Sequence, residues 1–112
     1  MNPINSINQL CIESHANAVI HGFWEGALRC NIGEKVALIH SEISEFWEGE
    51  RRGESPFPDE HCPEHPHGAI ELADVLIRIF DLAGHERYDL GAAVQAKMAY
   101  NKTRPHLHGK KC

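Results

Sequence analysis

The sequence predicts an all-α fold, a four-helix bundle completed by dimerisation, in a single domain that covers residues 1–112. Three observations support this prediction. Apolar residues recur at steps of three and four in four separate segments, which is the spacing of helices with one buried face. No segment shows the strict alternation of apolar and polar residues that is typical of a half-buried strand. A chain of 112 residues can bury one modest core but not two independent ones.

The first two helices are predicted from their apolar faces. One should run from about Ile4 to Ile20, with buried positions that include Ile4, Ile7, Leu10, Cys11 and Ala18. The helical pattern then lapses at 22–26, where two glycines flank two aromatic residues and Glu25. A second helix should run from about Ile32 to Gly49, with Val36, Ile39, Ile43 and Phe46 on one face and Leu38, Glu42 and Glu45 on another stripe.

A long connection separates the second helix from the third. Residues from about 52 to 68 include four prolines and two glycines, which oppose both helix and strand, so we expect a flexible loop. The third helix, about Ala69 to Ala83, is apolar on nearly every side. Such a helix must be covered on most of its faces, and one small domain offers too little cover. We therefore expect an obligate homodimer or a homotetramer.

The last helix is predicted from its apolar residues, Leu90, Ala93, Val94 and Met98, and from its ends. Gly84 is expected to end the third helix, because glycine commonly stands just after a helix C-terminus. Asp89 is placed to cap a fourth helix that stops near Pro105. The segment at about 106–112 is short and basic, and we expect it to be a flexible tail.

Composition excludes several classes of function. The net charge of −5 argues against nonspecific nucleic-acid binding, which needs clustered Lys and Arg. No apolar run approaches the roughly 20 residues of a membrane-spanning helix, and residues 1–5 do not resemble a secretory signal. We therefore expect a cytoplasmic protein without nucleic-acid or membrane partners. The four cysteines, Cys11, Cys30, Cys62 and Cys112, form no Cys-x-x-Cys pair, so we expect free thiols.

Two pairs of acidic residues predict a metal site. Glu71 and Asp74 interrupt the apolar third helix three positions apart, so both carboxylates project from one face. Glu42 and Glu45 repeat this spacing on the second helix. If the two helices pack against each other, four carboxylates converge, and oxygen ligands of this kind suit Mg²⁺, with Mn²⁺ as a substitute. The alternative is that these acids are solvated surface residues, an interpretation that we accept for Glu48 and Glu50.

Further candidates surround this predicted site. Asp81 lies on the same helical stripe as Glu71, Asp74 and Arg78. An ion pair with Arg78, or a supporting contact outside the metal ligands, is preferred over a role as a further ligand. Lys97, Asn101 and Arg104, with Tyr100 beside them, form a polar stripe on the fourth helix that can bind phosphates. The alternative for this stripe is a basic helix C-terminus that complements the helix dipole.

Aromatic and histidine residues complete the candidate set. Phe23, Trp24 and Trp47 are candidates for stacking on a nucleobase, with core packing as the alternative and a subunit contact as a further one for Trp47. The loop contains four possible metal ligands: His61, Cys62, His65 and His67. Their spacing matches no familiar zinc motif, so a lid that orders when substrate binds is the preferred interpretation.

Taken together, these motifs resemble the MazG-like family of all-α nucleoside triphosphate pyrophosphohydrolases. The family signature is Glu-x-x-Glu on one helix and Glu-x-x-Asp on the next, matched here by residues 42–45 and 71–74. Gly-Phe-Trp at 22–24 and the string 97–105 extend the resemblance over most of the chain. Many members carry another Glu where this chain has Ser41, so the number of metal ions and the general base stay open.

The resemblance implies a function and an assembly. It implies hydrolysis of (deoxy)nucleoside triphosphates between the α- and β-phosphates, which releases a nucleoside monophosphate and pyrophosphate, in a house-cleaning or pool-balancing role. It also implies a tight helical dimer or a dimer of dimers. Two alternatives belong to other classes: a regulatory module that binds nucleotide or metal without hydrolysis, and a structural or toxin–antitoxin-type interaction protein. The preferred base and sugar are left open.

Overall fold

The computed structural model describes residues 2–26 and 31–111. These residues form four α-helices and one short 3₁₀-helix: α1 (Pro3–Ile20), α2 (Ile32–Arg51), α3 (His67–Glu86), α4 (Leu90–Lys102) and η1 (His106–Gly109). Within the described ranges there is no strand beyond one isolated bridge between Pro58 and Pro66. The predicted all-α class is therefore confirmed. No helix in the described part of the chain is long and apolar enough to cross a membrane.

Side-chain caps explain where three of the helices begin. The Asn2 side chain accepts a hydrogen bond from the Asn5 backbone N–H at the start of α1, and Asn31 does the same for α2. Asp89 caps α4, as predicted, by accepting from the Ala92 N–H at 3.1 Å. Each cap supplies a partner for a backbone N–H that has none within its helix.

The prediction that Gly84 ends the third helix is wrong. α3 continues to Glu86, and the residue that leaves the helix is Arg87, with a left-handed φ of 61°. Gly84 instead lies where α3 crosses α1: a Cβ atom there would be 2.6 Å from the Cys11 carbonyl oxygen and 2.8 Å from the His15 Cβ. The glycine is therefore required by a close approach of two helices and not by a helix terminus.

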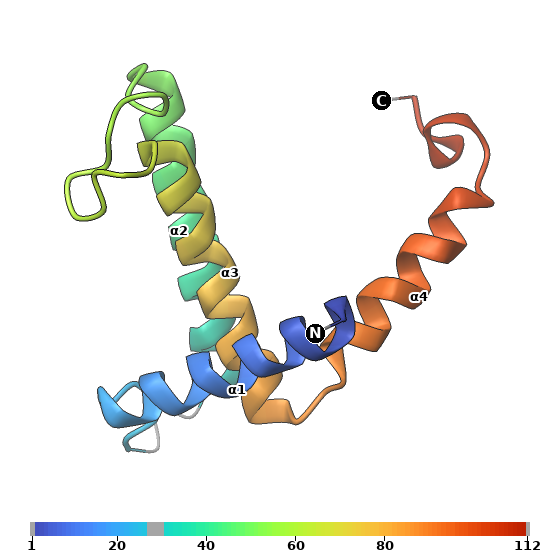
Figure 1. Cartoon of the computed structure of the whole chain (residues 1–112), viewed down its shortest axis with the longest axis horizontal. Helices are drawn as coiled ribbons and strands as arrows, with labels where there is room; N and C mark the ends of the chain where they lie inside the picture. Colours follow the sequence, from blue (N-terminus) through green and yellow to red (C-terminus); the bar gives the residue numbers. More distant parts are fainter. Residues whose placement is uncertain (1, 27–30, 112) are drawn as a thin grey trace.

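The helices form an open arrangement in a single chain (Figure 1). α2 and α3 pack side by side as a hairpin, α1 crosses one end of this pair, and α4 packs on α1 and extends away from the hairpin. The loop that joins α2 to α3 lies at the far end of the hairpin from α1. A closed four-helix bundle is therefore not formed by one copy of the chain.

This open shape leaves a thin core. Among the described apolar residues, Cys11 and Ala83 are buried, whereas Leu72, Leu76 and Ile77 of α3 are each more than 40% exposed. The radius of gyration is 16.2 Å, compared with about 13 Å for a compact domain of this length. The accessible surface of 8210 Å² exceeds the roughly 6,200 Å² that this mass predicts for a compact monomer. The fold therefore leaves much more apolar surface exposed than is usual.

Candidate metal centre

Acidic side chains from α2 and α3 converge in the hairpin. One ligand oxygen from each of Glu42, Glu45 and Glu71 lies within 4.8 Å of the other two. Glu42 and Glu45 share a face of α2 because residues three apart are neighbours on a helix, and the packing of α2 on α3 brings Glu71 opposite them. The convergence predicted from the two acidic pairs is thus present for three of the four carboxylates.

Asp74, the fourth predicted ligand, lies beside this cluster. It shares with Glu42 the wall of a neighbouring cleft, and burial raises the pKa of its carboxyl, with the Glu42 charge as a further cause. Asp74 is therefore close enough for the charge of Glu42 to change its pKa. It falls outside the group of three carboxylates that meets within 4.8 Å.

Without a bound cation, the carboxylates of the cluster repel one another. The negative charge of Glu42 is the largest cause of the raised pKa of Glu45, whereas burial is the largest cause of the raised pKa of Glu71. In addition, the Oε2 atom of Glu71 is buried and has no hydrogen-bond partner. Several carboxylates that repel one another, together with an orphaned buried oxygen, fit a divalent ion that prefers oxygen ligands, such as Mg²⁺ or Mn²⁺.

The loop between α2 and α3 has a defined conformation. Its backbone makes hydrogen bonds from Asp59 N–H to the His65 carbonyl at 2.9 Å and from His67 N–H to the Phe57 carbonyl at 2.7 Å. Asp59 is buried, and it accepts hydrogen bonds from the backbone N–H groups of His61 and Cys62, both at 2.9 Å. These bonds tie together both arms of the segment that was predicted to be a flexible loop.

His67 connects this loop to the acidic cluster. Its Nδ1 lies 2.8 Å from Asp59 Oδ1, and its Nε2 lies 3.3 Å from Glu71 Oε1. The hydrogen bond to Asp59 raises the pKa of His67, and the same bond lowers the pKa of Asp59. Within the described residues, His61, Cys62, His65 and His67 do not form a group that could hold a metal.

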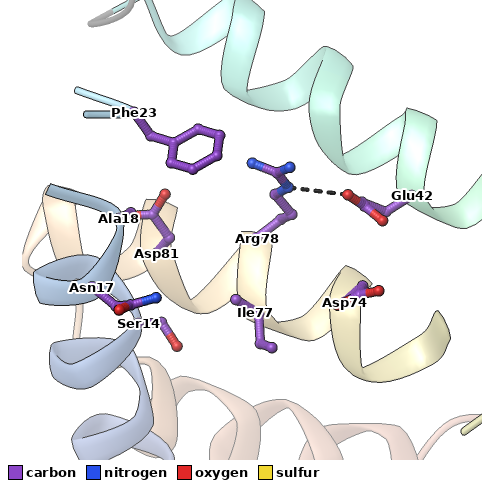
Figure 2. Close-up of a pocket in the computed structure, with 9 residues that line it drawn as sticks. All are labelled: Ser14, Asn17, Ala18, Phe23, Glu42, Asp74, Ile77, Arg78 and Asp81. Carbon is purple, nitrogen blue, oxygen red and sulfur yellow. Dashed lines mark hydrogen bonds and ion pairs between the residues drawn. The ribbon is translucent and has the colours of Figure 1, made fainter. Parts of the chain in front are cut away.

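A cleft of about 180 Å³ lies beside the acids (Figure 2). Its walls come from α1, from the segment after α1, and from α2 and α3: Ser14, Asn17, Ala18, Phe23, Glu42, Asp74, Ile77, Arg78 and Asp81. The Phe23 ring lies 5.0 Å from the Arg78 guanidinium carbon. Phe23, a predicted stacking residue, therefore lines the same cleft as Glu42 and Asp74, with its ring against Arg78.

The ion pair between Asp81 and Arg78, one of the alternatives for Asp81, is not formed. Arg78 reaches across to α2 and donates from Nε to Glu42 Oε1 at 3.3 Å. Asp81 is buried and binds His15 Nδ1 and Trp24 Nε1, each at 2.9 Å. The reason is that α1 packs on α3 and brings His15 to Asp81, while Trp24 reaches it from the segment after α1, so Asp81 Oδ1 has two partners other than the guanidinium.

The other two aromatic candidates have different surroundings. Trp24 stacks on His85 with ring centroids 3.9 Å apart, and Lys35 Nζ lies 4.1 Å from its ring centre. Lys35 is itself buried and donates to the Phe23 carbonyl. Trp24 is therefore engaged in packing between helices, whereas Trp47 on α2 is 60% exposed.

The predicted phosphate-binding stripe lies elsewhere. Lys97 and Asn101 are on α4, which extends away from the α2–α3 hairpin (Figure 1), and Arg104 lies just after the end of this helix. Lys97 Nζ and the Arg104 guanidinium lie 4.6 and 5.6 Å from the Tyr100 ring centre. One copy of the chain therefore does not bring this stripe to the acidic cluster.

Sequence reasoning did not find the role of Asp59 or the pairing of His67 with Glu71. The second had a signal, because residues 67 and 71 are four apart and share a helix face. Asp59 had no signal, since its contact with His67 depends on the turn of the loop. Ser14 and Asn17 of the cleft were also missed, because single Ser and Asn side chains on a helix carry no signal of a binding site in the sequence.

Comparisons with protein-family models, with curated proteins and with solved structures found no match. The fold and the site therefore define the chain as an all-helical protein with a cluster of carboxylates that could hold a metal ion.

Proposed function

We propose that this protein is a Mg²⁺-dependent nucleoside triphosphate pyrophosphohydrolase of the MazG-like type. The observation that carries the proposal is the convergence of Glu42, Glu45 and Glu71 within 4.8 Å, with Asp74 beside them. Mg²⁺ is commonly shared between protein carboxylates and the phosphates of a substrate. The order of the two acidic pairs along the chain, which matches the MazG-like signature, supports this choice over other phosphate chemistry.

The residues have distinct roles in this proposal. Glu42, Glu45, Glu71 and Asp74 hold Mg²⁺, which when bound neutralises phosphate charge and lowers the pKa of a coordinated water. Arg78, whose Nε contacts Glu42 at 3.3 Å, fixes the direction of that carboxylate. Phe23 lies at the cleft next to the acids and offers its ring to the base. The choice of the bond between the α- and β-phosphates comes from the resemblance to the MazG-like family.

The proposal includes a homodimer or homotetramer. The surplus of roughly 2,000 Å² of surface per chain, relative to a compact monomer, matches the size of obligate interfaces, about 2,000–5,000 Å² in total. In such an assembly, α4 of a second copy and the residue Arg104 that follows it could bring the phosphate-binding stripe, Lys97, Asn101 and Arg104, to the acidic cluster. The alternative function is that of a regulatory protein that binds a nucleotide or metal ion without hydrolysis.

Pyrophosphate release from a panel of canonical and modified nucleoside triphosphates tests the proposal. We expect Mg²⁺-dependent release of pyrophosphate and monophosphate, and a loss of at least about 100-fold in kcat for Glu71→Gln, since a ligand of the ion is removed. Glu48→Gln is the matched control, because Glu48 lies on α2 but pairs with Arg51 at 2.9 Å. Nucleotide binding without turnover would favour the regulatory module, and release of orthophosphate would contradict the proposed bond.

A further inference from the structure

His67 stands between two carboxylates that belong to different parts of the molecule. Its Nδ1 is 2.8 Å from Oδ1 of Asp59 in the loop, and its Nε2 is 3.3 Å from Oε1 of Glu71 on α3. The exposed fractions of the three side chains are 4% for Asp59, 24% for His67 and 16% for Glu71. An imidazole that contacts a carboxylate through each nitrogen has both the position and the rotation of its ring fixed.

Asp59, the loop residue in this series of contacts, is itself held by hydrogen bonds. Asp59 Oδ1 faces His67, while its Oδ2 accepts from the backbone N–H groups of His61 and Cys62, both at 2.9 Å. Both oxygens of the buried carboxylate therefore have partners. The loop is tied to the start of α3 by the hydrogen bond from Gly68 N–H to the Ser55 carbonyl at 3.0 Å.

Two glycines make room for this arrangement. A Cβ on Gly49 of α2 would lie 3.3 Å from His67 Cδ2 and 3.5 Å from its Nε2. A Cβ on Gly68 would lie 3.0 Å from the Ser55 Cβ. α2 thus approaches the His67 ring closely at Gly49, and the loop approaches the start of α3 closely at Gly68.

Glu71, the other carboxylate that contacts His67, is a proposed metal ligand. Glu71 Oε1 is engaged by His67, whereas Oε2 is buried and lacks a hydrogen-bond partner. One oxygen therefore faces the imidazole, and the other is available to a cation. A glutamate has three rotatable side-chain bonds, and fixing it before the ion arrives removes an entropic cost of binding.

We propose that His67 is a positioning residue that orients Glu71 for the divalent cation, and that the loop residue Asp59 holds His67 in place for this purpose. This inference rests on the metal site of the proposed function, but it concerns how the site is built and not which bond is cleaved. Removal of such an outer partner typically weakens metal affinity by about 10–100-fold.

Binding of Mn²⁺ without nucleotide tests the inference, with electron paramagnetic resonance used to measure free Mn²⁺. We expect the Kd to rise about 10-fold or more in His67→Asn, which keeps a donor toward Asp59 but none that reaches Glu71. His67→Gln places an amide nitrogen near the former Nε2 and should recover part of the loss. Asp59→Asn should weaken binding in the same direction, and the exposed His65→Asn is the matched control in the same loop.

The outcomes separate the inference from the proposed function. Mn²⁺ binding that weakens in His67→Asn supports the inference even if the wild-type protein releases no pyrophosphate, a result that would remove only the proposed function. Normal hydrolysis with an unchanged Mn²⁺ Kd in His67→Asn overturns the inference alone. An equal loss in His67→Gln and His67→Asn also overturns it, because the loss then does not depend on a donor near Glu71.

A measurement on the wild-type protein tests the inference even if the variants fail to fold. In ¹⁵N-resolved NMR spectra of the histidine rings, addition of Mg²⁺ should shift the His67 signals, because the partner of Nε2 becomes a ligand of the ion. The His65 signals should stay unchanged. If Mg²⁺ saturates the protein and the His67 signals do not move, the inference is wrong.

Discussion

Replacing Glu45 with glutamine should stabilise the metal-free protein and remove most of the stability that the protein gains from Mg²⁺. Glu45 is exposed, and the charge of Glu42 is the largest cause of its raised pKa, with a smaller contribution from Asp74. A carboxyl whose pKa is raised by folding favours the folded state below its ordinary pKa of 4.5. That contribution is lost as the pH rises through the folded-state pKa.

The size of the effect follows from the geometry of the cluster. Two charges at the 4.8 Å limit of separation repel each other by about 0.9 kcal/mol at the dielectric constant of water. Glu45 faces Glu42 and Glu71 at this range, and salt at 0.1 M screens part of the repulsion. We therefore expect Glu45→Gln to stabilise the metal-free protein by about 1 kcal/mol at pH 8, or roughly 4–8 °C in Tm.

Thermal unfolding at pH 5 and pH 8, with EDTA or with Mg²⁺, measures this effect. The advantage of Glu45→Gln in EDTA should be largest at pH 8 and should shrink toward pH 4.5, where the wild-type carboxyls become protonated. Addition of 1 M salt should also reduce it. In Mg²⁺ the order should reverse, because an ion at 100 times its Kd stabilises the wild-type protein by about 2.7 kcal/mol.

Glu48→Gln is the control for a general loss of negative charge on α2. Glu48 pairs with Arg51, and a surface pair of this kind contributes at most about 1 kcal/mol, so this variant should be unchanged or slightly less stable. The electrostatic reasoning is refuted if Glu45→Gln is no more stable than wild type in EDTA at low salt. It is also refuted if both proteins gain equally from Mg²⁺.

Two further predictions concern the fold and its assembly. Gly84→Ala should destabilise the protein by about 1–3 kcal/mol in urea unfolding, because the new Cβ would lie 2.6 Å from the Cys11 carbonyl oxygen; an unchanged midpoint would contradict the close crossing of α1 and α3. Leu76→Asp should weaken self-association by roughly 30-fold in light scattering at graded concentrations, since the side chain is 48% exposed in one chain and two half-buried leucines contribute about 2 kcal/mol per dimer. A wild-type protein that is monomeric at micromolar concentration would contradict the second prediction.

Local patterns in the sequence predicted the helices well. Apolar periodicity located all four, because the face that a helix buries repeats every 3.6 residues regardless of its partner. Asp89 was found as a cap for the same reason, since a cap acts within one turn. The pairs Glu42–Glu45 and Glu71–Asp74 were also local, because residues three apart on a helix share a face.

The error at Gly84 shows where local patterns stop. A glycine after an apolar run has the composition of a helix terminus, yet α3 continues through it. The residue is glycine because α1 crosses there, and a crossing between residues 11 and 84 leaves no trace in the sequence around either one. Packing between distant segments overrides a local signal of this kind.

The sequence by itself determined which residues are helical and which carboxylates share a helix face. The tertiary structure decided which of those faces meet: Glu71 opposite Glu42 and Glu45, Arg78 on Glu42, Asp81 on His15 and Trp24, and α4 away from the hairpin. The physical reason is the distance along the chain over which each interaction acts. A helix and its caps are set by interactions within about four residues, whereas the partner of a charged side chain is set by burial and direction across elements that the chain brings together only when it folds.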